Sequence, residues 1–294
     1  MNALYIIGNG FDLFHRLPTS YSHFHNYVIG NNTELLNTLD WYFSFETGNG
    51  YLWTNFEDDL RTFEASSFFD DNDNVNLSGD NVGWSSAFGL QDELEEETTN
   101  LVSGIKQAFG DWIDSIDIEL VKPVITFQED AFFLTFNYTL VLENVYKIDP
   151  GNILHIHGDT TYGADDLIFG HNIDFPEEPE LDENGDSNRT MFTDAENASK
   201  IPLHAFRKPV EDTVLNNQRT FASLCNVREI FVLGHSLNEI DLPYLKEIIK
   251  ASNNRVWYVT YYNEKEKQHH LTTLLQLGVT SELINLIKMD KLIK

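Results

Sequence analysis

The sequence has almost no cysteine. Cys225 is the only one in 294 residues, so neither an internal disulfide nor the usual cysteine-based zinc cluster can form. This scarcity is typical of a protein of the reducing cytoplasm, where we expect this chain to be located. The sequence also lacks any run of about twenty apolar residues, and its start has no basic region before a long apolar segment. We therefore expect neither a membrane span nor a signal peptide.

Basic residues are scarce as well. The chain has 19 Lys and Arg against 47 Asp and Glu, a formal net charge of -28 at pH 7. Direct nucleic-acid binding is not expected, because phosphate backbones are held chiefly by clustered Lys and Arg. A small nucleotide remains compatible with this charge if backbone amides and a few local cations hold it. The 41% hydrophobic content is enough for a packed interior.

The most informative stretch is at the start of the chain. The apolar run Leu4–Ile7 predicts a buried strand, and Gly8-Asn9-Gly10-Phe11-Asp12 follows it directly. The glycines allow a tight turn and the close approach of a ligand. Ligands of open parallel sheets bind beyond the carboxyl ends of the strands, so this turn is predicted to border a binding site. The full dinucleotide-binding pattern has a third glycine, which this turn lacks. The alternative is therefore a plain turn in which Asp12 caps a helix.

Two further strands end in polar residues. A predicted strand at 131–135 leads to Asn137, whose amide could orient a ribose or a water, or could close its own turn. A strand at 152–157 places His155 and His157 on one face by alternation, with Gly158 leaving His157 at the tip. Such histidines suit proton transfer or hydrogen bonding, and as a pair they could equally bind a metal.

The later part of the chain repeats the opening pattern. An apolar strand at 229–233 is followed by Gly234, His235 and Ser236, whose backbone amides could face a ligand. Asp241 could accept hydrogen bonds from ribose hydroxyls or cap the next helix. Residues 167–172 predict a short strand ending in Gly170-His171, and 255–262 predict the last strand, with two helices after it.

Most of the remaining sequence predicts helices. Apolar residues recur at helical spacing over 32–45, 55–66 and 89–116, and residues 68–86 predict a polar surface loop that lacks a complete calcium motif. We predict an α/β fold: one Rossmann-like domain over 1–294, with an open, mainly parallel sheet flanked by helices. Residues 32–125 are expected to form a mostly helical insertion. Its role could be that of a lid, a surface for a partner, or a simple scaffold.

Several of these motifs together resemble the AbiH family of bacteriophage abortive infection proteins. The resemblance spans nearly the whole chain and implies an antiphage defence protein, with a defence-system or phage protein as a further partner. The motifs are Ile7-Gly8-Asn9-Gly10-Phe11-Asp12, Leu17-Pro18-Thr19-Ser20-Tyr21, Trp53 with Phe56-Glu57, Thr135-Phe136-Asn137-Tyr138, His155-Ile156-His157-Gly158, Gly234-His235-Ser236-Leu237 and Asp241-Leu242-Pro243-Tyr244.

The order of these motifs is also similar, more distantly, to sirtuin-like NAD-binding domains of antiphage systems. That similarity implies that Gly8 and Gly10 contact the pyrophosphate of NAD, Asn137 and His157 the nicotinamide ribose, and Gly234 with Ser236 the adenosine side. The first turn differs from the Gly-Ala-Gly-x-Ser pattern of sirtuins. The four-cysteine zinc module of deacylating sirtuins cannot form here, so deacetylation is not expected.

The resulting hypothesis is an NAD-consuming defence effector that cleaves the nicotinamide glycosidic bond. Asn137 is expected to position ribose or water, His157 to act as base or hydroxyl contact, and Asp12 to stabilise the developing cation. One alternative is a metal-dependent phosphohydrolase or nuclease with Asp12, His155, His157 and His171 as ligands. Another is a nucleotide sensor without enzymatic activity. The residues expected to bind the nucleotide are Gly8, Asn9, Gly10, His155, Gly158, Gly234, His235, Ser236 and Asp241.

Overall fold

The computed structural model of the chain describes residues 2–46, 53–73, 84–176 and 179–292. It contains two compact units. The first comprises Met1–Ser20, Gly110–Ile168 and Pro209–Lys294, and the second comprises Tyr21–Phe109 and Phe169–Lys208. The expected single domain with an insertion at 32–125 stays a prediction. The second unit begins earlier than that segment and includes a later part of the chain.

The first unit is built on a six-stranded sheet in which every pairing is parallel. The strand order β3-β2-β1-β4-β5-β6 is that of Rossmann folds, so the predicted fold class is confirmed. The order reverses direction between β1 and β4, and such a switch point opens a crevice beyond the carboxyl ends of the strands. The strands are β1 (Ala3–Ile7), β2 (Ala131–Thr135), β3 (Ile153–His155), β4 (Glu229–Leu233), β5 (Val256–Tyr261) and β6 (Ile284–Lys288).

The register brings the ends of four strands to one level. Ile7 of β1 lies opposite Thr135 of β2 and Leu233 of β4, and Thr135 lies opposite His155 of β3. Residues that follow these strands therefore meet along one edge of the sheet. We call it the carboxyl edge.

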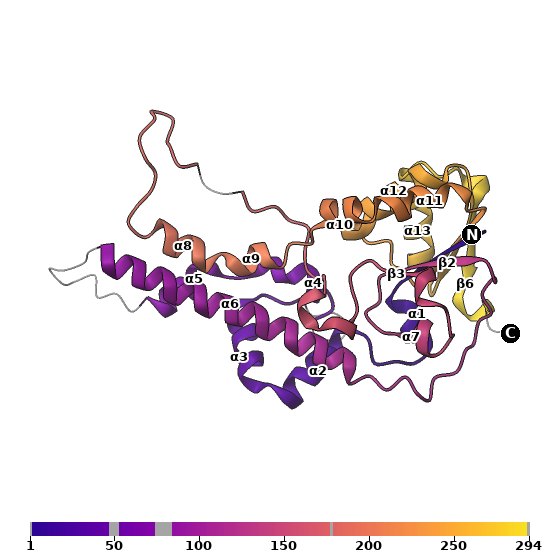
Figure 1. Cartoon of the computed structure of the whole chain (residues 1–294), viewed down its shortest axis with the longest axis horizontal. Coiled ribbons are helices and arrows are strands. Elements are labelled where there is room, and N and C mark those ends of the chain that lie inside the picture. Colours follow the sequence, from indigo (N-terminus) through magenta and orange to yellow (C-terminus); the bar gives the residue numbers. More distant parts are fainter. Residues whose placement is uncertain (1, 47–52, 74–83, 177–178, 293–294) are drawn as a thin grey trace. The chain divides into compact units, whose positions relative to one another are not determined.

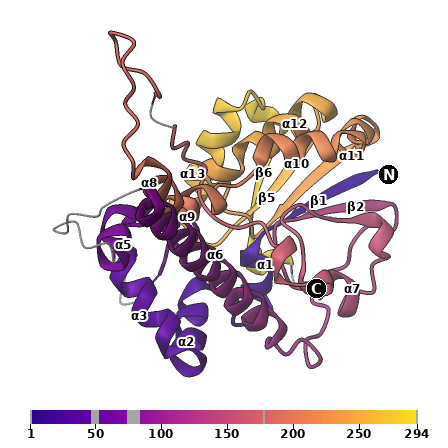
Figure 2. The ribbon, with the colours of Figure 1, turned by 60° about the vertical axis from the view of Figure 1, so that its left-hand side comes forward.

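Alternating side chains give the sheet two different faces. Leu4, Ile6 and Leu134 belong to a hydrophobic core that also includes residues of α11 (Gln218–Ser223) and α12 (Leu242–Ser252). On the opposite face, Tyr5 stacks between Phe133 and Phe231, with ring centroids 5.2 and 4.7 Å away. Figure 2 shows α10, α11 and α12 on one side of the sheet and α1 with α7 on the other. The sheet is thus covered on both faces, as parallel sheets require.

The second unit is helical, and aromatic side chains form its core. Phe24, Trp53 and Phe56 are almost fully buried, and their ring centroids lie 5.1 to 5.6 Å apart. The ring of Phe109 stacks on that of Phe169 at 4.4 Å, which joins the two chain segments of this unit. Burial of such large rings is a major source of stability for a unit whose described residues form no sheet.

The helices are labelled in Figure 1. Those of the first unit are α1 (Asn9–Phe14), α7 (Val141–Asn144), α10 (Val210–Asn216), α11 (Gln218–Ser223), α12 (Leu242–Ser252) and α13 (Glu264–Gln276). Those of the second are α2 (Tyr21–Asn31), α3 (Thr33–Tyr42), α4 (Phe56–Asp59), α5 (Ala65–Asn72), α8 (Thr193–Ser199) and α9 (Ile201–Ala205), while α6 (Trp84–Asp114) belongs to it as far as Phe109. No helix of the described residues is long and apolar enough to span a membrane.

Three sequence predictions of local structure were wrong. Residues 167–172 do not form a strand of the sheet, because only an isolated bridge from His171 to Arg207 occurs there. The helix expected at 55–66 ends in a 3-10 turn at Leu60–Thr62 before α5 begins. Strand β6 was missed because an edge strand has one neighbour, and its partly exposed residues give a weak apolar pattern.

The loop expected at 68–86 is only partly described. Its first residues continue α5 to Asn72, and residues 74–83 lie outside the described residues.

Candidate functional site

Asp12 is a buried carboxyl group at the carboxyl edge. The turn after β1 leads directly into α1, which places Asp12 inside the unit with 1% of its surface exposed. The Thr139 hydroxyl donates a hydrogen bond of 2.5 Å to Asp12 Oδ2. Burial raises the pKa of Asp12 to about 7, although Thr139, Asn137 and His155 all favour the ionised form. This carboxyl therefore changes charge near neutral pH.

Asn137 follows β2 and lies beside Asp12. Its side chain is 5% exposed, yet neither Nδ2 nor Oδ1 forms a hydrogen bond of ordinary geometry. The backbone of the residue is held firmly, because its N–H donates to Thr135 Oγ1 and its carbonyl accepts from His155 Nδ1. Leaving a buried polar group unpaired costs about 1 to 3 kcal/mol. Such an amide is suited to bind a ligand that supplies the missing partners.

His155 forms a partly buried pair with Glu143 of α7. Its Nε2 lies 2.8 Å from Glu143 Oε1, and its Nδ1 lies 3.0 Å from the Asn137 carbonyl. Both neighbours are acceptors, so the doubly protonated ring satisfies both contacts. Burial opposes protonation, but the hydrogen bond and the charge of Glu143 outweigh it and raise the pKa of His155. The Glu143 carboxylate therefore favours the protonated form of the His155 ring.

A pocket of about 270 Å³ opens beside this pair. Its lining residues include Glu143, Ile153, His155, Gly158, Asp159 and Asp166. Three of them carry carboxylates, whose charge disfavours phosphate and favours a neutral or positively charged group. His155 links the pocket to Asn137.

His157 belongs to a second group of side chains. The prediction that it shares a face with His155 was wrong, because β3 ends at His155 and a turn follows. The His157 ring contacts Phe136 and Tyr138, with centroids 5.2 and 6.3 Å away. Asn137 and Thr139, by contrast, lie beside Asp12, and with His155 and Glu143 these residues form what we call the Asp12 cluster. Successive residues of an extended segment point to opposite sides, so these two clusters flank the segment 135–139.

The second group continues through the loop after β4. His157 Nε2 lies 3.7 Å from Asp241 Oδ1, and His235 Nε2 lies 3.5 Å from Asp241 Oδ2. Ser236 of the same loop is exposed. The structure therefore brings His157, His235 and Asp241 together, and separately Asp12 with Asn137.

The two glycine turns pack against each other. The N–H groups of Gly8 and Gly10 donate to the carbonyls of Leu233 and Gly234, at 3.0 and 2.8 Å. A Cβ atom on Gly234 would lie 2.1 Å from the Phe11 nitrogen, so only glycine fits there. A pyrophosphate contact by these amides requires the turns to separate. That predicted contact stays a prediction, and so does the role of Asn9, whose amide donates to the Thr19 carbonyl.

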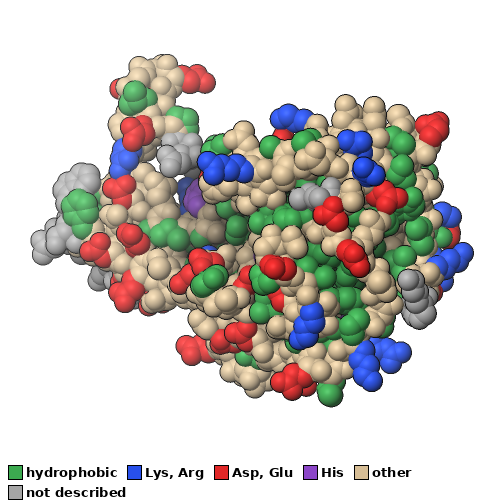
Figure 3. Space-filling model, turned by 45° about the vertical axis from the view of Figure 1, so that its right-hand side comes forward, with side chains coloured by type: hydrophobic (Ala, Val, Ile, Leu, Met, Phe, Trp, Pro, Cys, Tyr) green, Lys and Arg blue, Asp and Glu red, His purple; other side chains and the backbone are tan. Residues whose placement is uncertain are grey.

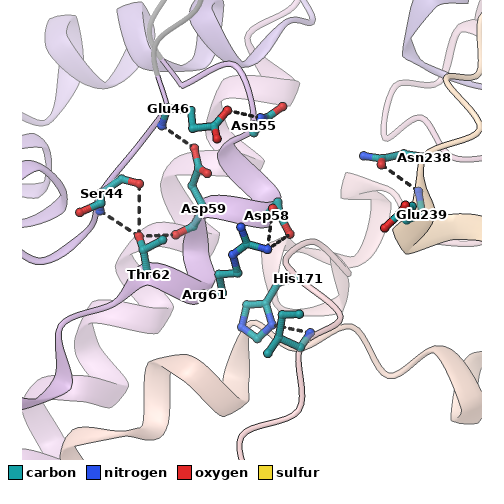
Figure 4. Close-up of polar contacts among 11 residues, drawn as sticks. Ser44, Glu46, Asn55, Asp58, Asp59, Arg61, Thr62, His171, Asn238 and Glu239 are labelled. Carbon is teal, nitrogen blue, oxygen red and sulfur yellow. Dashed lines mark hydrogen bonds and ion pairs between the residues drawn. The ribbon is translucent and has the colours of Figure 1, made fainter.

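The second unit has polar groups of its own. Lys208 and Tyr21 both contact the Glu57 carboxylate, and the Lys208 nitrogen lies 2.5 Å from Glu57 Oε2. Figure 4 shows the hydrogen bonds around α4 and the His171 ring, whose Nδ1 accepts from the Ile173 N–H at 3.2 Å. Burial lowers the pKa of His171. These contacts hold together the two chain segments of the unit.

The predicted metal ligands of the phosphohydrolase or nuclease alternative are Asp12, His155, His157 and His171. His171 belongs to the second unit, whereas Asp12, His155 and His157 belong to the first. Both ring nitrogens of His155 already face protein acceptors. Among the residues that the structure describes, no group of three or more His, Cys, Asp or Glu side chains is arranged to hold a metal ion.

Two residues of the Asp12 cluster were not predicted as site residues. Thr139 follows Asn137 by two positions, and this spacing on an extended segment could have indicated that they share a side. Glu143 gave less signal, because an acidic residue at the start of a helix is common on solvated surfaces.

Comparison with known proteins identifies the family. No curated protein and no solved structure matches the chain. The family model described as bacteriophage abortive infection AbiH matches residues 4–261, which include every strand but β6 and both clusters of the carboxyl edge. Its match supports a role in abortive infection of bacteriophage. The chain therefore belongs to the AbiH family.

Proposed function

We propose that this chain is an abortive-infection effector that binds NAD or a related nucleotide at the carboxyl edge and hydrolyses its nicotinamide glycosidic bond. The observation that carries the proposal is the buried Asn137 amide, whose nitrogen and oxygen form no hydrogen bond of ordinary geometry, beside a carboxyl group with a pKa of about 7. The Rossmann strand order supports it, because nucleotides bind at this edge in such sheets. The resemblance to sirtuin-like domains remains a prediction.

The proposed reaction breaks the bond between C1′ of the ribose and the pyridinium nitrogen. The bonding electron pair moves to the nitrogen, nicotinamide leaves, and positive charge develops on the ribose. Ionised Asp12 stabilises that charge, and Asn137 orients the ribose or the attacking water. The water oxygen bonds to C1′, and its proton passes to a base. His157, which lies on the other side of the segment 135–139 from Asp12, is the proposed base or ribose-hydroxyl contact, and this role requires the ribose to reach both sides of that segment.

The acidic pocket matches the substrate's charge. Glu143, Asp159 and Asp166 give it negative potential, and the nicotinamide ring of oxidised NAD carries a positive charge. Departure of the ring as a neutral molecule weakens this attraction and favours its release. The anionic pyrophosphate is then expected to lie away from the pocket, further along the edge.

The test measures nicotinamide release and thermal stability with NAD and a panel of nucleotides, with and without lysate of phage-infected cells. Asn137→Leu keeps the number and branching of the side-chain heavy atoms and removes an amide that forms no hydrogen bond of ordinary geometry. We expect this variant to lose nicotinamide release by about 100-fold or more while its Tm stays at or above that of the parent. Asn144→Leu, at an exposed position of α7, is the matched control and should keep full activity.

The outcomes separate the alternatives. His157→Ala is expected to abolish release without unfolding the protein. Stabilisation by nucleotide without any product would indicate a non-enzymatic sensor. Intact NAD under all these conditions would contradict the proposed hydrolysis.

A further inference from the structure

His155 connects a carboxylate to the backbone of Asn137. It is the last residue of β3 and lies opposite Thr135 in the sheet. Its Nδ1 lies 3.0 Å from the Asn137 carbonyl oxygen, and its Nε2 lies 2.8 Å from Glu143 Oε1. A carbonyl oxygen can only accept a hydrogen bond, so Nδ1 carries a proton and donates it to Asn137.

Both ring nitrogens of His155 therefore face acceptors within the protein. The His155 side chain is 9% exposed and that of Glu143 is 15% exposed. A ligand can form a hydrogen bond with this ring only if one of the two contacts breaks. The arrangement favours an action of His155 on the protein over a direct contact with the nucleotide.

The Asn137 backbone is held on both sides of its Cα atom. Its N–H donates to Thr135 Oγ1 at 3.1 Å, and its carbonyl accepts from His155. The side-chain amide is buried, and neither Nδ2 nor Oδ1 forms a hydrogen bond of ordinary geometry. Leaving such a group unpaired is costly, which favours any movement toward a nearby partner. The two backbone hydrogen bonds oppose this movement and keep the amide available to a ligand.

The charge of Glu143 strengthens the contact between His155 and Asn137. Burial opposes protonation of the ring, but the hydrogen bond and the charge of Glu143 raise the pKa of His155. A charged donor forms a hydrogen bond roughly twice as strong as a neutral one. The contact at Nε2 also fixes the orientation of the ring.

We propose that His155 and Glu143 are positioning residues for Asn137. The Nδ1–H of His155 fixes the Asn137 carbonyl, and Glu143 fixes the His155 ring through Nε2. This inference rests on the proposed function only for its effect on nicotinamide release. It gives His155 a different role from the nucleotide contact that its sequence position suggested.

Two variants of His155 isolate the donor. Asparagine places its amide nitrogen where Nδ1 lies in histidine. Leucine has the same number and branching of side-chain heavy atoms as asparagine, but it has no donor. Both variants remove the ring that reaches Glu143. The comparison of His155→Asn with His155→Leu therefore measures the contribution of the donor to Asn137.

The first measurement is the NMR signal of the Asn137 carbonyl. Labelling asparagine with carbon-13 at the backbone carbonyl and tyrosine with nitrogen-15 marks two peptide bonds, Asn26-Tyr27 and Asn137-Tyr138. We expect the Asn137 signal to move upfield in His155→Leu, because the carbonyl loses its hydrogen bond, and to stay close to the parent position in His155→Asn. The Asn26 signal comes from the second unit and should stay unchanged.

A second pair of variants tests Glu143. Glu143→Gln keeps an acceptor for the ring and removes the charge, so the Asn137 signal should move in the same direction as in His155→Leu but less far. Glu129→Gln removes a charge at an exposed position before β2, and should leave that signal unchanged. This pair carries the test should His155→Leu not fold.

The second measurement is nicotinamide release. We expect His155→Leu to lower kcat by about 100-fold with little change in KM, because a displaced Asn137 no longer orients the reacting groups. His155→Asn should recover about tenfold or more of that loss, since it returns the donor. Thermal unfolding shows that the variants compared are folded.

The outcomes separate this inference from the proposed function. An Asn137 signal that His155→Leu leaves in place, or that moves equally in His155→Asn, overturns the positioning role even if NAD is hydrolysed. Unchanged kcat in a folded His155→Leu also overturns it, and a raised KM in that case would show that His155 contacts the ligand. The expected carbonyl signals without any NAD cleavage leave the hold of His155 on Asn137 standing and remove the proposed hydrolysis.

Discussion

At the scale of single residues, the carboxyl edge holds groups that reduce the stability of the free protein. Asp12 is buried with its pKa raised to about 7, and Asn137 has a buried amide whose nitrogen and oxygen form no hydrogen bond of ordinary geometry. Neither arrangement is needed for packing, because apolar or neutral side chains of similar size would cost less to bury. Such local costs are typical of sites that bind or react.

Replacing Asp12 by Asn tests this cost. The pKa of Asp12 rises from 3.8 in the unfolded chain to about 7 in the fold, so its stabilising contribution is complete below pH 4 and is lost as the pH rises to about 7. At 1.36 kcal/mol per pH unit, the loss reaches about 4 kcal/mol. We therefore expect Asp12→Asn to be more stable than the parent at pH 8, with the difference vanishing toward pH 4.

Denaturant unfolding at several pH values measures this difference. Asp92→Asn on the exposed face of α6 serves as the control and should follow the parent at every pH. A constant difference between Asp12→Asn and the parent from pH 4 to 8 would show that Asp12 does not titrate as described.

At the scale of elements, the turns after β1 and β4 form one packed unit. The turn after β1 donates two backbone hydrogen bonds to the carbonyls of Leu233 and Gly234, and Gly234 adopts a φ of 66° close to the Phe11 nitrogen. Sequence reasoning predicted that both glycine turns would face a ligand. In the structure the two turns approach each other closely, as glycine permits, and this fixes the positions of Asp12 and His235 on either side; ligand contact by the turns stays a prediction.

Substituting Ala for Gly234 tests this packing. An alanine there is strained by the positive φ and also collides with backbone atoms, the nearest at 2.1 Å. Gly278 has a φ of 93° with nothing near its Cβ position, so Gly278→Ala measures the conformational strain alone. We expect Gly278→Ala to cost about 1 to 2 kcal/mol and Gly234→Ala at least about 2 kcal/mol more, both measured by equilibrium unfolding. Equal costs would mean that the turns separate easily.

At the scale of the whole molecule, negative charge dominates. The excess of 47 acidic over 19 basic residues gives a net charge of -28. On the face shown in Figure 3, basic side chains lie in small groups between acidic ones. Self-repulsion of this charge opposes the compact state.

Salt is therefore expected to stabilise the protein. Raising sodium chloride from about 10 mM to 150 mM shortens the Debye length from about 30 to 8 Å, which screens repulsion between distant carboxylates. We expect the Tm to rise by about 2 to 4 °C for each kcal/mol gained, most of it below 150 mM, and potassium chloride to act equally. A Tm that falls with salt would indicate that attractive ion pairs, such as Lys208 with Glu57, outweigh the repulsion.

The sequence by itself determined the fold class and the strands that frame the site. Buried parallel strands are near-continuous apolar runs, so Leu4–Ile7, 131–135 and 229–233 were evident from local pattern alone. The family could also be predicted from the sequence, and its model matches residues 4–261. The half-exposed edge strand β6 escaped notice because its pattern is weak.

Only the tertiary structure decided which of the predicted residues meet. It joined Asp12 to Asn137 and Thr139, paired His155 with Glu143, and grouped His157 with His235 and Asp241. The end of β3 at His155 separated two histidines that alternation had placed together. Which side chains meet across loops depends on the strand register and on the residue at which each strand ends. Local sequence patterns predict neither of these.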